Sequence, residues 1–216
     1  MAKTFWPAVG GRAYISLATI TSGAKMEQGL KKRRGLLLDR DGVINADRGY
    51  VVAREQFAFM PGVFPFLRAA RDHGFRLAIL TNQSGVARGL YRESDYESLT
   101  AWMLGQLAGE GISIDLTLAS FEHPEGTVAA YTRQSFWRKP NPGMVLEAVQ
   151  RLRLDPARSA FLGDKASDME AAKAGGIGTC LYLMPAGTDV AENAKIIKNL
   201  DEAIETLRTI ASSLAS

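Results

Sequence analysis

The sequence predicts an α/β domain in three layers, a parallel β-sheet with helices on both of its faces. From residue 35 onward, short continuous apolar runs alternate with amphipathic stretches of helical spacing. Several of the apolar runs end in polar residues, and the carboxyl ends of parallel strands meet at one edge of a sheet. A chain of 216 residues is long enough to bury one core of this kind.

Composition and charge exclude several classes of protein. Hydrophobic residues make up 46% of the chain and charged residues 23%, which excludes wholesale disorder. The sequence has no apolar run of about 18 residues, so we expect no membrane partner. The net charge of +3 is too small to imply a nucleic-acid partner. The single cysteine, Cys180, cannot close an intrachain disulfide, so we expect a cytoplasmic protein.

The chain is interpreted as an N-terminal extension, residues 1–34, followed by one domain, residues 35–216. The apolar stretch 13–20 has a faint likeness to a secretory signal, but glycines, a proline and Arg12 interrupt the apolar segment before it. We therefore expect no secretion signal. The basic run 31–34 is typical of a solvated segment that leads into a buried strand.

Five short apolar runs predict the strands of the sheet. They lie at residues 36–38, 77–80, 114–118, 160–162 and 179–183. Continuous apolar runs of this length are typical of parallel strands that are buried on both faces. Asp39, Thr81 and Asp164 follow three of these strands, which places polar side chains at one edge of the sheet.

Helices are predicted between and after these strands. They lie at residues 63–73, 96–107, 143–152, 167–174 and 200–213. Gly74 suits the C-terminal cap of the first helix. Asn141 and Pro142 match the N-cap and the first turn of the third helix. Ser167 and Glu170 have the spacing of a capping box for the fourth helix.

One segment, residues 120–139, shows little periodicity. A loop of about twenty residues is unusual in a compact domain and tends to be functional. Because it ends at Lys139, just before a predicted helix, it brings a basic side chain to the edge where the strands end.

Two acidic residues directly after the first predicted strand indicate a metal site. Asp39 and Asp41 can hold a divalent cation and leave one oxygen for chemistry. A calcium-binding loop is excluded. That motif needs an acid or amide at its fifth position, where this chain has Val43, and a glycine at its sixth, where this chain has Ile44. A plain turn at a strand end is the alternative for this run taken alone.

Four motifs in a fixed order resemble the haloacid dehalogenase superfamily, phosphoryl-transfer enzymes with an aspartate nucleophile. The motifs lie at residues 39–42, 81–82, 138–140 and 163–168. The resemblance implies a Rossmann-like sheet of three layers. It also implies no large cap domain, because the segments between the motifs are too short, the one from Ser120 excepted.

The resemblance also implies the catalytic roles. Asp39 is the expected nucleophile, and Asp41 is the expected acid and base for the leaving oxygen and the attacking water. Thr81 and Lys139 are expected to bind the phosphoryl oxygens. Mg²⁺ is the expected cofactor, held by the carboxylates of Asp39 and Asp164 and by the backbone carbonyl of Asp41.

A narrower resemblance, over residues 35–183, is to the D,D-heptose 1,7-bisphosphate phosphatase family, close kin of histidinol-phosphate phosphatases. It implies a substrate pocket, a monomer and a small phosphate ester as the partner molecule. The expected pocket residues are Asp47, Arg48, Gly49, Tyr50, Asn82, Gln83, Ser84, Arg138 and Lys165. A heptose bisphosphate is the leading substrate; histidinol phosphate and a catalytically silent binding protein are the alternatives.

The sequence departs from that family in the segment 120–139. Family members carry four cysteine and histidine ligands of a zinc ion there, and this chain has Ser120, Glu122, Ser135 and Trp137 at those positions. One carboxylate cannot replace four ligands, so we expect no structural zinc. We expect aromatic packing by Phe121, Tyr131, Phe136 and Trp137 to hold the loop instead, and the loop to be the more mobile part of the fold.

Overall fold

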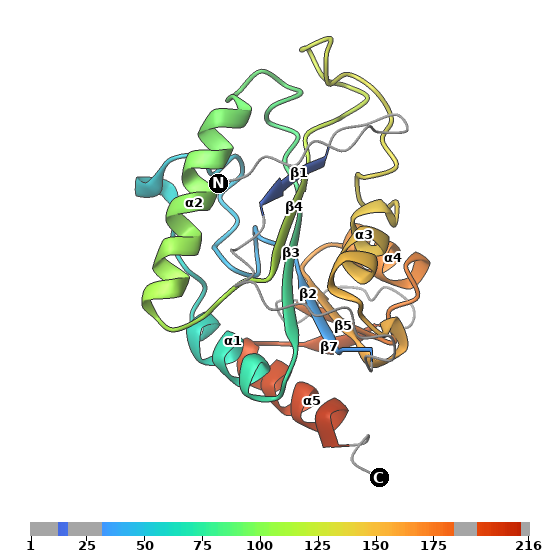
Figure 1. Ribbon diagram of the computed structural model, residues 1–216. Coiled ribbons are helices and arrows are strands. Elements are labelled where there is room, and N and C mark those ends of the chain that lie inside the picture. The colour runs from blue at the N-terminus through green and yellow to red at the C-terminus, as the bar shows by residue number, and fades with distance from the viewer. Residues whose placement is uncertain (1–12, 17–31, 184–193, 213–216) are drawn as a thin grey trace, which may run out of the picture.

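The computed structural model describes residues 13–16, 32–183 and 194–212, and it shows one sheet of seven strands covered by helices on both faces (Figure 1). The strand order is β1-β4-β3-β2-β5-β6-β7. All neighbouring strands pair in parallel except β1, which pairs antiparallel with β4. The predicted fold class is confirmed.

All five predicted strands are present, and two strands are additional. The predicted ones are β2 (Gly35–Leu38), β3 (Arg76–Asn82), β4 (Leu116–Ser120), β5 (Ala160–Gly163) and β6 (Thr179–Leu183). The additional strands are β1 (Ala13–Ser16) and β7 (Lys195–Ile197), which form the two edges of the sheet. Strand β1 comes from the predicted N-terminal extension, most of which lies outside the described residues.

The five helices divide between the two faces of the sheet (Figure 1). α1 (Val63–Asp72), α2 (Glu93–Gly109) and α5 (Leu200–Ser212) cover one face, and α3 (Gly143–Leu152) and α4 (Ala166–Ala174) cover the other. None of the described helices is long and apolar enough to cross a membrane.

Alternate residues of β2 supply the two halves of the core. Leu36 and Leu38 pack with residues of α1, α2 and α5, whereas Leu37 packs with residues of α3 and α4. All three leucines are fully buried, and each contributes about 1.5–3 kcal/mol of hydrophobic free energy. This packing on both faces fixes the strand, and thereby the position of Asp39 directly after it.

Two helix starts differ from the prediction. α2 begins at Glu93, three residues early, because the Asp95 carboxylate accepts a hydrogen bond from the Arg92 N–H and caps a longer helix. The predicted capping box of α4 is wrong: the cap is Lys165, whose N–H donates to Asp168 Oδ2 at 3.1 Å. Asp168 is therefore the residue turned back toward the end of the sheet.

The segments between strands and helices carry no large cap domain within the described part of the chain. The connection from β2 to α1 contains only a short 3-10 turn, Arg54–Gln56. The connection from β4 to α3 contains no regular element. Both connections start from the carboxyl end of the parallel strands, the edge at which ligands gather in sheets of this kind.

Candidate active site

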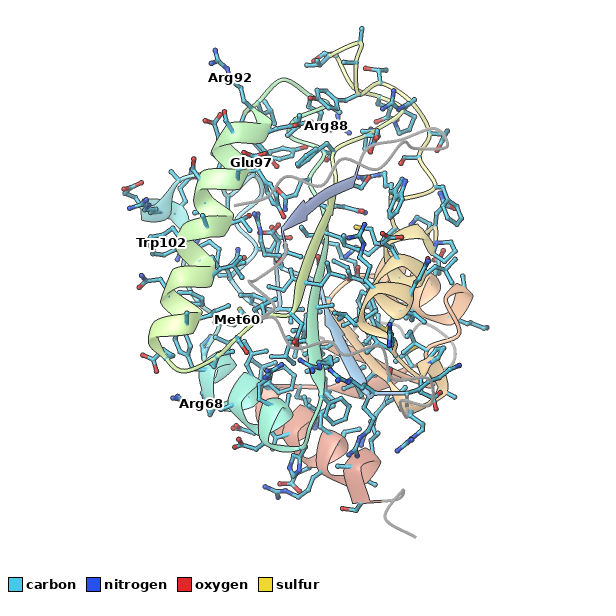
Figure 2. The ribbon with its side chains drawn as sticks, viewed as in Figure 1. Met60, Arg68, Arg88, Arg92, Glu97 and Trp102 are labelled. Carbon is cyan, nitrogen blue, oxygen red and sulfur yellow. The ribbon has the colours of Figure 1, made fainter. Side chains whose placement is uncertain are left out.

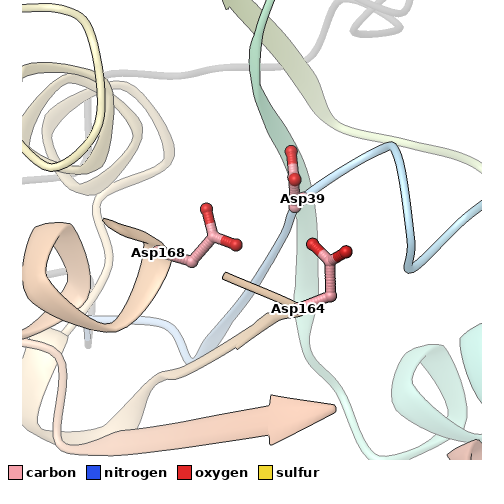
Figure 3. Close-up of side chains that lie close together, drawn as sticks. All are labelled: Asp39, Asp164 and Asp168. Atoms are coloured by element: carbon pink, nitrogen blue, oxygen red, sulfur yellow. The ribbon is translucent and has the colours of Figure 1, made fainter. Parts of the chain in front are cut away.

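Three carboxylates meet where β2 and β5 end. Asp39 follows β2, Asp164 follows β5 and Asp168 lies in the first turn of α4 (Figure 3). One oxygen from each lies within 4.8 Å of the other two. Gly42 is required here, because its φ is +85° and a Cβ would come within 2.0 Å of Asp164 Oδ2. The three residues are called the carboxylate cluster below.

The Lys139 ammonium lies inside this cluster. Its Nζ is 2.9 Å from Asp39 Oδ1, 2.6 Å from Asp168 Oδ1 and 2.7 Å from the carbonyl oxygen of Leu80. Burial acts to lower the pKa of Lys139, but Asp168 and Asp39 raise it above its ordinary value. Lys139 therefore stays charged and neutralises part of the negative charge around Asp39.

Asp164 has no such partner for one of its oxygens. Its Oδ1 is buried and accepts no hydrogen bond. Burial, together with the nearby Asp39, raises the pKa of Asp164 to about 7. Burial likewise raises the pKa of Asp39, although Lys139 opposes that rise. Mg²⁺ prefers oxygen ligands, and carboxylates above all. The carboxylate cluster, with its unpaired Asp164 oxygen, therefore fits a bound Mg²⁺ ion.

The Asp41 side chain lies outside the cluster and is surrounded by hydrogen-bond donors. Arg40 donates from Nη2 to Oδ2 at 2.8 Å and to Oδ1 at 2.9 Å. Asn45 Nδ2 donates to Oδ1 and Gln83 Nε2 donates to Oδ2, both at 2.9 Å. Asp41 is 8% exposed, so few other partners compete for it. The Asp41 side chain is thus not part of the carboxylate cluster. This agrees with the expectation that Asp41 would contribute only its backbone carbonyl to a metal ion.

The predicted residues at the carboxyl end of β3 have two kinds of partner, and the strand itself runs on through Thr81 and Asn82. Asn82 clamps the backbone of Lys139, since its Nδ2 donates to the Lys139 carbonyl at 2.9 Å and its Oδ1 accepts from the Lys139 N–H at 3.1 Å. Thr81 is 1% exposed and its Oγ1 accepts from Gln83. Ser84 is partly exposed beside them. Asn82 thus fixes the end of the long loop against β3.

Four of the residues predicted to line the substrate pocket lie in the connection from β2 to α1, called the first loop here. All four are exposed: Asp47, Arg48, Gly49 and Tyr50. Lys165 reaches this loop, and its Nζ is 2.9 Å from Asp47 Oδ2. Burial acts to raise the pKa of Asp47, but the hydrogen bonds from Lys165 and the Gly49 N–H lower it. The pair ties the first loop to the end of β5.

A group of cationic side chains lies above the site. Arg88 Nη2 is 3.3 Å from His123 Nε2, and Arg88 lies at the end of the molecule where the long loop runs (Figure 2). Burial and Arg88 lower the pKa of Arg138, and burial, Arg138 and Arg88 lower the pKa of His123. Arg138 Nη1 and Arg88 Nε are buried without a hydrogen-bond partner. The two neighbouring arginines and their unused donors make this a place that an anion would stabilise, whereas the lowered pKa of His123 favours its neutral ring.

The four positions that correspond to zinc ligands form a polar network of their own. The Ser120 hydroxyl donates to Glu122 Oε2 at 3.2 Å, and Arg133 Nη2 donates to Glu122 Oε1 at 3.2 Å. Glu122 is 1% exposed and Ser135 is buried, whereas Trp137 is partly buried. The Ser135 hydroxyl accepts from the Trp137 N–H at 3.2 Å.

The expected aromatic packing of the loop is present in part. Phe121 is buried and meets Tyr131 edge to face at 6.4 Å between ring centres. Trp137 packs against the core beneath α3 and α4. Phe136 is 55% exposed, so its predicted contribution is wrong. The loop is held by aromatic contacts, by the hydrogen bonds around Glu122 and by hydrogen bonds to other segments, such as that from the Tyr131 hydroxyl to Glu93 Oε1 at 2.6 Å.

A comparison with family models gives a match over residues 9–176 to haloacid dehalogenase-like hydrolases. The chain belongs to that family. The sequence motifs, the fold and the model agree, and the resemblance drawn from the sequence is confirmed.

Curated relatives of this hydrolase narrow the comparison. It is 45% identical over 152 residues, 70% of this chain and 80% of the relative, to D-glycero-alpha-D-manno-heptose-1,7-bisphosphate 7-phosphatase of Burkholderia mallei. It is 44% identical over 144 residues, 67% of this chain and 77% of the relative, to D-glycero-beta-D-manno-heptose-1,7-bisphosphate 7-phosphatase of Yersinia pestis.

Solved structures show the same family. A crystal structure from Mesorhizobium loti, described as that of a HAD-like phosphatase, has a TM-score of 0.79 and 30% identity, over 94% of this chain and 97% of that one. The D,D-heptose 1,7-bisphosphate phosphatase from B. bronchiseptica, complexed with magnesium and phosphate, has a TM-score of 0.68 and 27% identity, over 82% of this chain and 98% of that one.

Three residues of the hydrolase's site were not among those singled out from the sequence. Asp168 was missed because the helix cap was assigned to Ser167, although its spacing of four residues from Asp164 was a signal. Arg40 is 2% exposed with its guanidinium over the Tyr96 ring at 5.7 Å, and nothing in the sequence shows that this arginine is buried. Arg88 lies far from His123 in the sequence, and only the fold brings the two together.

Proposed function

We propose that this hydrolase is a magnesium-dependent phosphatase that removes the 7-phosphate of D-glycero-D-manno-heptose 1,7-bisphosphate through an aspartyl-phosphate on Asp39. The observation that carries the proposal is the position of Asp39 at the end of β2, within the carboxylate cluster and 2.9 Å from Lys139. The heptose bisphosphate phosphatases among its relatives support the substrate.

In the first step, an Asp39 carboxylate oxygen attacks phosphorus. A bond forms between that oxygen and phosphorus, and the bond from phosphorus to the sugar oxygen breaks. Asp41 donates a proton to the departing oxygen, which leaves as the sugar alcohol. Thr81 and Lys139 stabilise the phosphoryl oxygens as charge redistributes.

In the second step, water attacks the phosphorus of the aspartyl-phosphate. Asp41, now a carboxylate, accepts the proton of that water, and inorganic phosphate leaves as Asp39 is regenerated. Arg40, Asn45 and Gln83 hold the Asp41 side chain in one orientation, and the hydrogen bonds that they donate favour the carboxylate that accepts this proton.

Magnesium would be held by carboxylate oxygens of Asp39 and Asp164 and by the backbone carbonyl of Asp41. When bound, it supplies positive charge that reduces the repulsion between the Asp39 carboxylate and the phosphate. That repulsion is about 4 kcal/mol per pair of charges at 4 Å and an effective dielectric constant near 20. Lys139 supplies one permanent positive charge toward the same end.

The cationic group above the site supports a substrate with two phosphates. Arg138 and Arg88 would receive the second anion, because each is cationic and has a buried donor without a hydrogen-bond partner. The relatives differ in the anomer at carbon one, so both anomers are candidates. Histidinol phosphate carries one phosphate and would leave this group unpaired, which makes it the weaker alternative.

We further propose that the enzyme acts in the cytoplasm as a monomer. A single half-buried cysteine, Cys180, suits a reducing compartment.

The test is phosphate release by the purified protein with and without Mg²⁺. The substrates are both heptose bisphosphate anomers, histidinol phosphate and a generic aryl phosphate. We expect kcat/KM to be highest for one of the heptose bisphosphates and to vanish on chelation. Faster turnover of histidinol phosphate would reverse the choice of substrate. No release from any substrate would leave a silent binding protein as the function.

A further inference from the structure

The Gln83 side chain joins three groups beneath the proposed reaction site. Its Nε2 is 2.9 Å from Asp41 Oδ2 and 2.9 Å from Thr81 Oγ1, and its Oε1 is 2.6 Å from the Tyr91 hydroxyl. Gln83 is 3% exposed and Tyr91 is 9% exposed, so little water competes for these bonds.

The direction of each hydrogen bond follows from the chemistry of the groups. An Asp41 carboxylate can only accept, so the amide atom that faces it must be the NH₂ of Gln83. The amide oxygen then faces Tyr91, whose hydroxyl must donate to it. Burial raises the pKa of the Tyr91 phenol, which keeps that proton in place. Tyr91 therefore anchors the oxygen end of the Gln83 amide in the orientation that Asp41 requires.

This orientation has a consequence for Thr81. Its hydroxyl oxygen accepts one of the two Gln83 amide protons. A hydroxyl has a single proton of its own, and that proton is left free to donate to a phosphoryl oxygen. The other amide proton holds Asp41 Oδ2 on the side opposite Asn45, which donates to Oδ1.

We propose that Tyr91 and Gln83 are positioning residues that orient the Asp41 carboxylate and the Thr81 hydroxyl for phosphoryl transfer. The proposal rests on the phosphatase function proposed above. It gives Gln83 a task other than direct contact with the substrate, because both ends of its amide are already bonded to protein groups. The Tyr91 ring also fits closely over Gly85, where a Cβ would come within 2.0 Å of it.

Tyr91→Phe removes the hydroxyl and keeps the packing of the ring over Gly85. We expect kcat to fall about tenfold and KM to change less than about twofold, because without the hydrogen bond to its Oε1 the Gln83 amide is anchored only through its NH₂ and holds Asp41 and Thr81 less firmly. Tyr182→Phe is the matched control, since Tyr182 is also 9% exposed but lies on β6 in the core against α3 and α4. It should leave kcat unchanged.

A double-mutant cycle tests whether Tyr91 acts through Gln83. Gln83→Leu should lower kcat more than Tyr91→Phe does, because it removes both amide protons. In the Gln83→Leu background, Tyr91→Phe should then lower kcat by less than about twofold. Equal effects of Tyr91→Phe in both backgrounds, or full kcat in Tyr91→Phe, would overturn the proposal. The proposed phosphatase function would still stand in that case, because the wild-type protein would be active.

A second measurement needs no turnover. In ¹⁵N NMR spectra, the Gln83 side-chain amide should give one pair of protons that exchange slowly with solvent in the wild-type protein. Tyr91→Phe should speed that exchange at least about tenfold, and Tyr182→Phe should not. Equal exchange in all three proteins would contradict the proposed orientation even if the wild type released no phosphate.

Discussion

The carboxylate cluster and the loop over residues 121–138 lie next to each other but are stabilised in different ways. In the cluster, Asp39 and Asp168 are buried, and the buried Lys139 bonds to both of them and to the carbonyl oxygen of Leu80. In the loop, Glu122 is 1% exposed but its partner Arg133 is 45% exposed. The central ion pairs of the cluster are thus enclosed by the protein, whereas the ion pair of the loop is open to solvent on its Arg133 side.

The largest effect is expected in the cluster. Asp39→Asn should lower kcat by more than about a thousandfold, because an amide cannot form the aspartyl-phosphate. Asp201→Asn, the same change on the exposed first turn of α5, is the control and should keep full activity. Full activity of the Asp39 variant in a phosphate-release assay would contradict the covalent mechanism. It would also show that the cluster matters no more for the reaction than the loop does.

Asp168→Asn should have the next largest effect. The change leaves Lys139 with Asp39 as its only carboxylate partner and removes one charge from the cluster. We expect Mg²⁺ affinity to fall about 10- to 100-fold, as for other residues that orient metal ligands. Calorimetric titration with MgCl₂ measures this. An affinity equal to that of the wild type would show that Asp168 has no part in metal binding.

The pH dependence of Mg²⁺ binding should reflect the unpaired oxygen of Asp164. Below its pKa of about 7 the carboxyl is protonated, so the metal must displace a proton. Affinity should therefore rise about tenfold per pH unit up to about pH 7 and then level off. Titrations between pH 5.5 and 8.5 in two buffers of different ionisation enthalpy would also count the released protons. A flat profile would contradict the environment assigned to Asp164.

The smallest effect is expected in the loop. Glu122→Gln weakens the ion pair with Arg133, and we expect kcat/KM for the bisphosphate to fall about two- to fivefold. Activity on an aryl phosphate, which does not reach Arg138, should stay unchanged. An equal fall for both substrates would show that the loop supports the cluster itself.

Elemental analysis of the same loop should find no stoichiometric zinc. A structural zinc site needs about four suitable ligands, and the four positions here offer one carboxylate, two hydroxyls and an indole. About one zinc per chain, with activity lost on chelation and restored by zinc, would show that this account of the loop is wrong.

The sequence predicted the interior of the fold better than its edges. Five strands and the positions of Asp39 and Asp164 follow from continuous apolar runs and from what comes directly after them. Strand β1 could not be predicted, because its pairing with β4 joins residues about a hundred positions apart. The boundary between the extension, residues 1–34, and the domain stays a prediction, since β1 contributes to the sheet and most of the extension lies outside the described residues.

Site residues that lie at the end of a strand could be predicted from the sequence. Site residues whose position depends on tertiary packing were missed. Arg40 stands between two predicted residues, yet only the fold shows that it is buried against Asp41. Arg88 reaches His123 across a sequence separation of 35 residues. Gln83 was predicted at the site, but its bonds to Asp41, Thr81 and Tyr91 depend on the way its amide is turned.

Trapping of the covalent intermediate tests the central claim most directly. Enzyme mixed with heptose bisphosphate and Mg²⁺ is quenched with borohydride, which reduces an aspartyl-phosphate to the alcohol, homoserine, and peptides are then read by mass spectrometry. We expect homoserine at position 39 in the wild-type protein and none in Asp39→Asn. Phosphate release without homoserine at position 39, or with homoserine at another aspartate, would contradict the account.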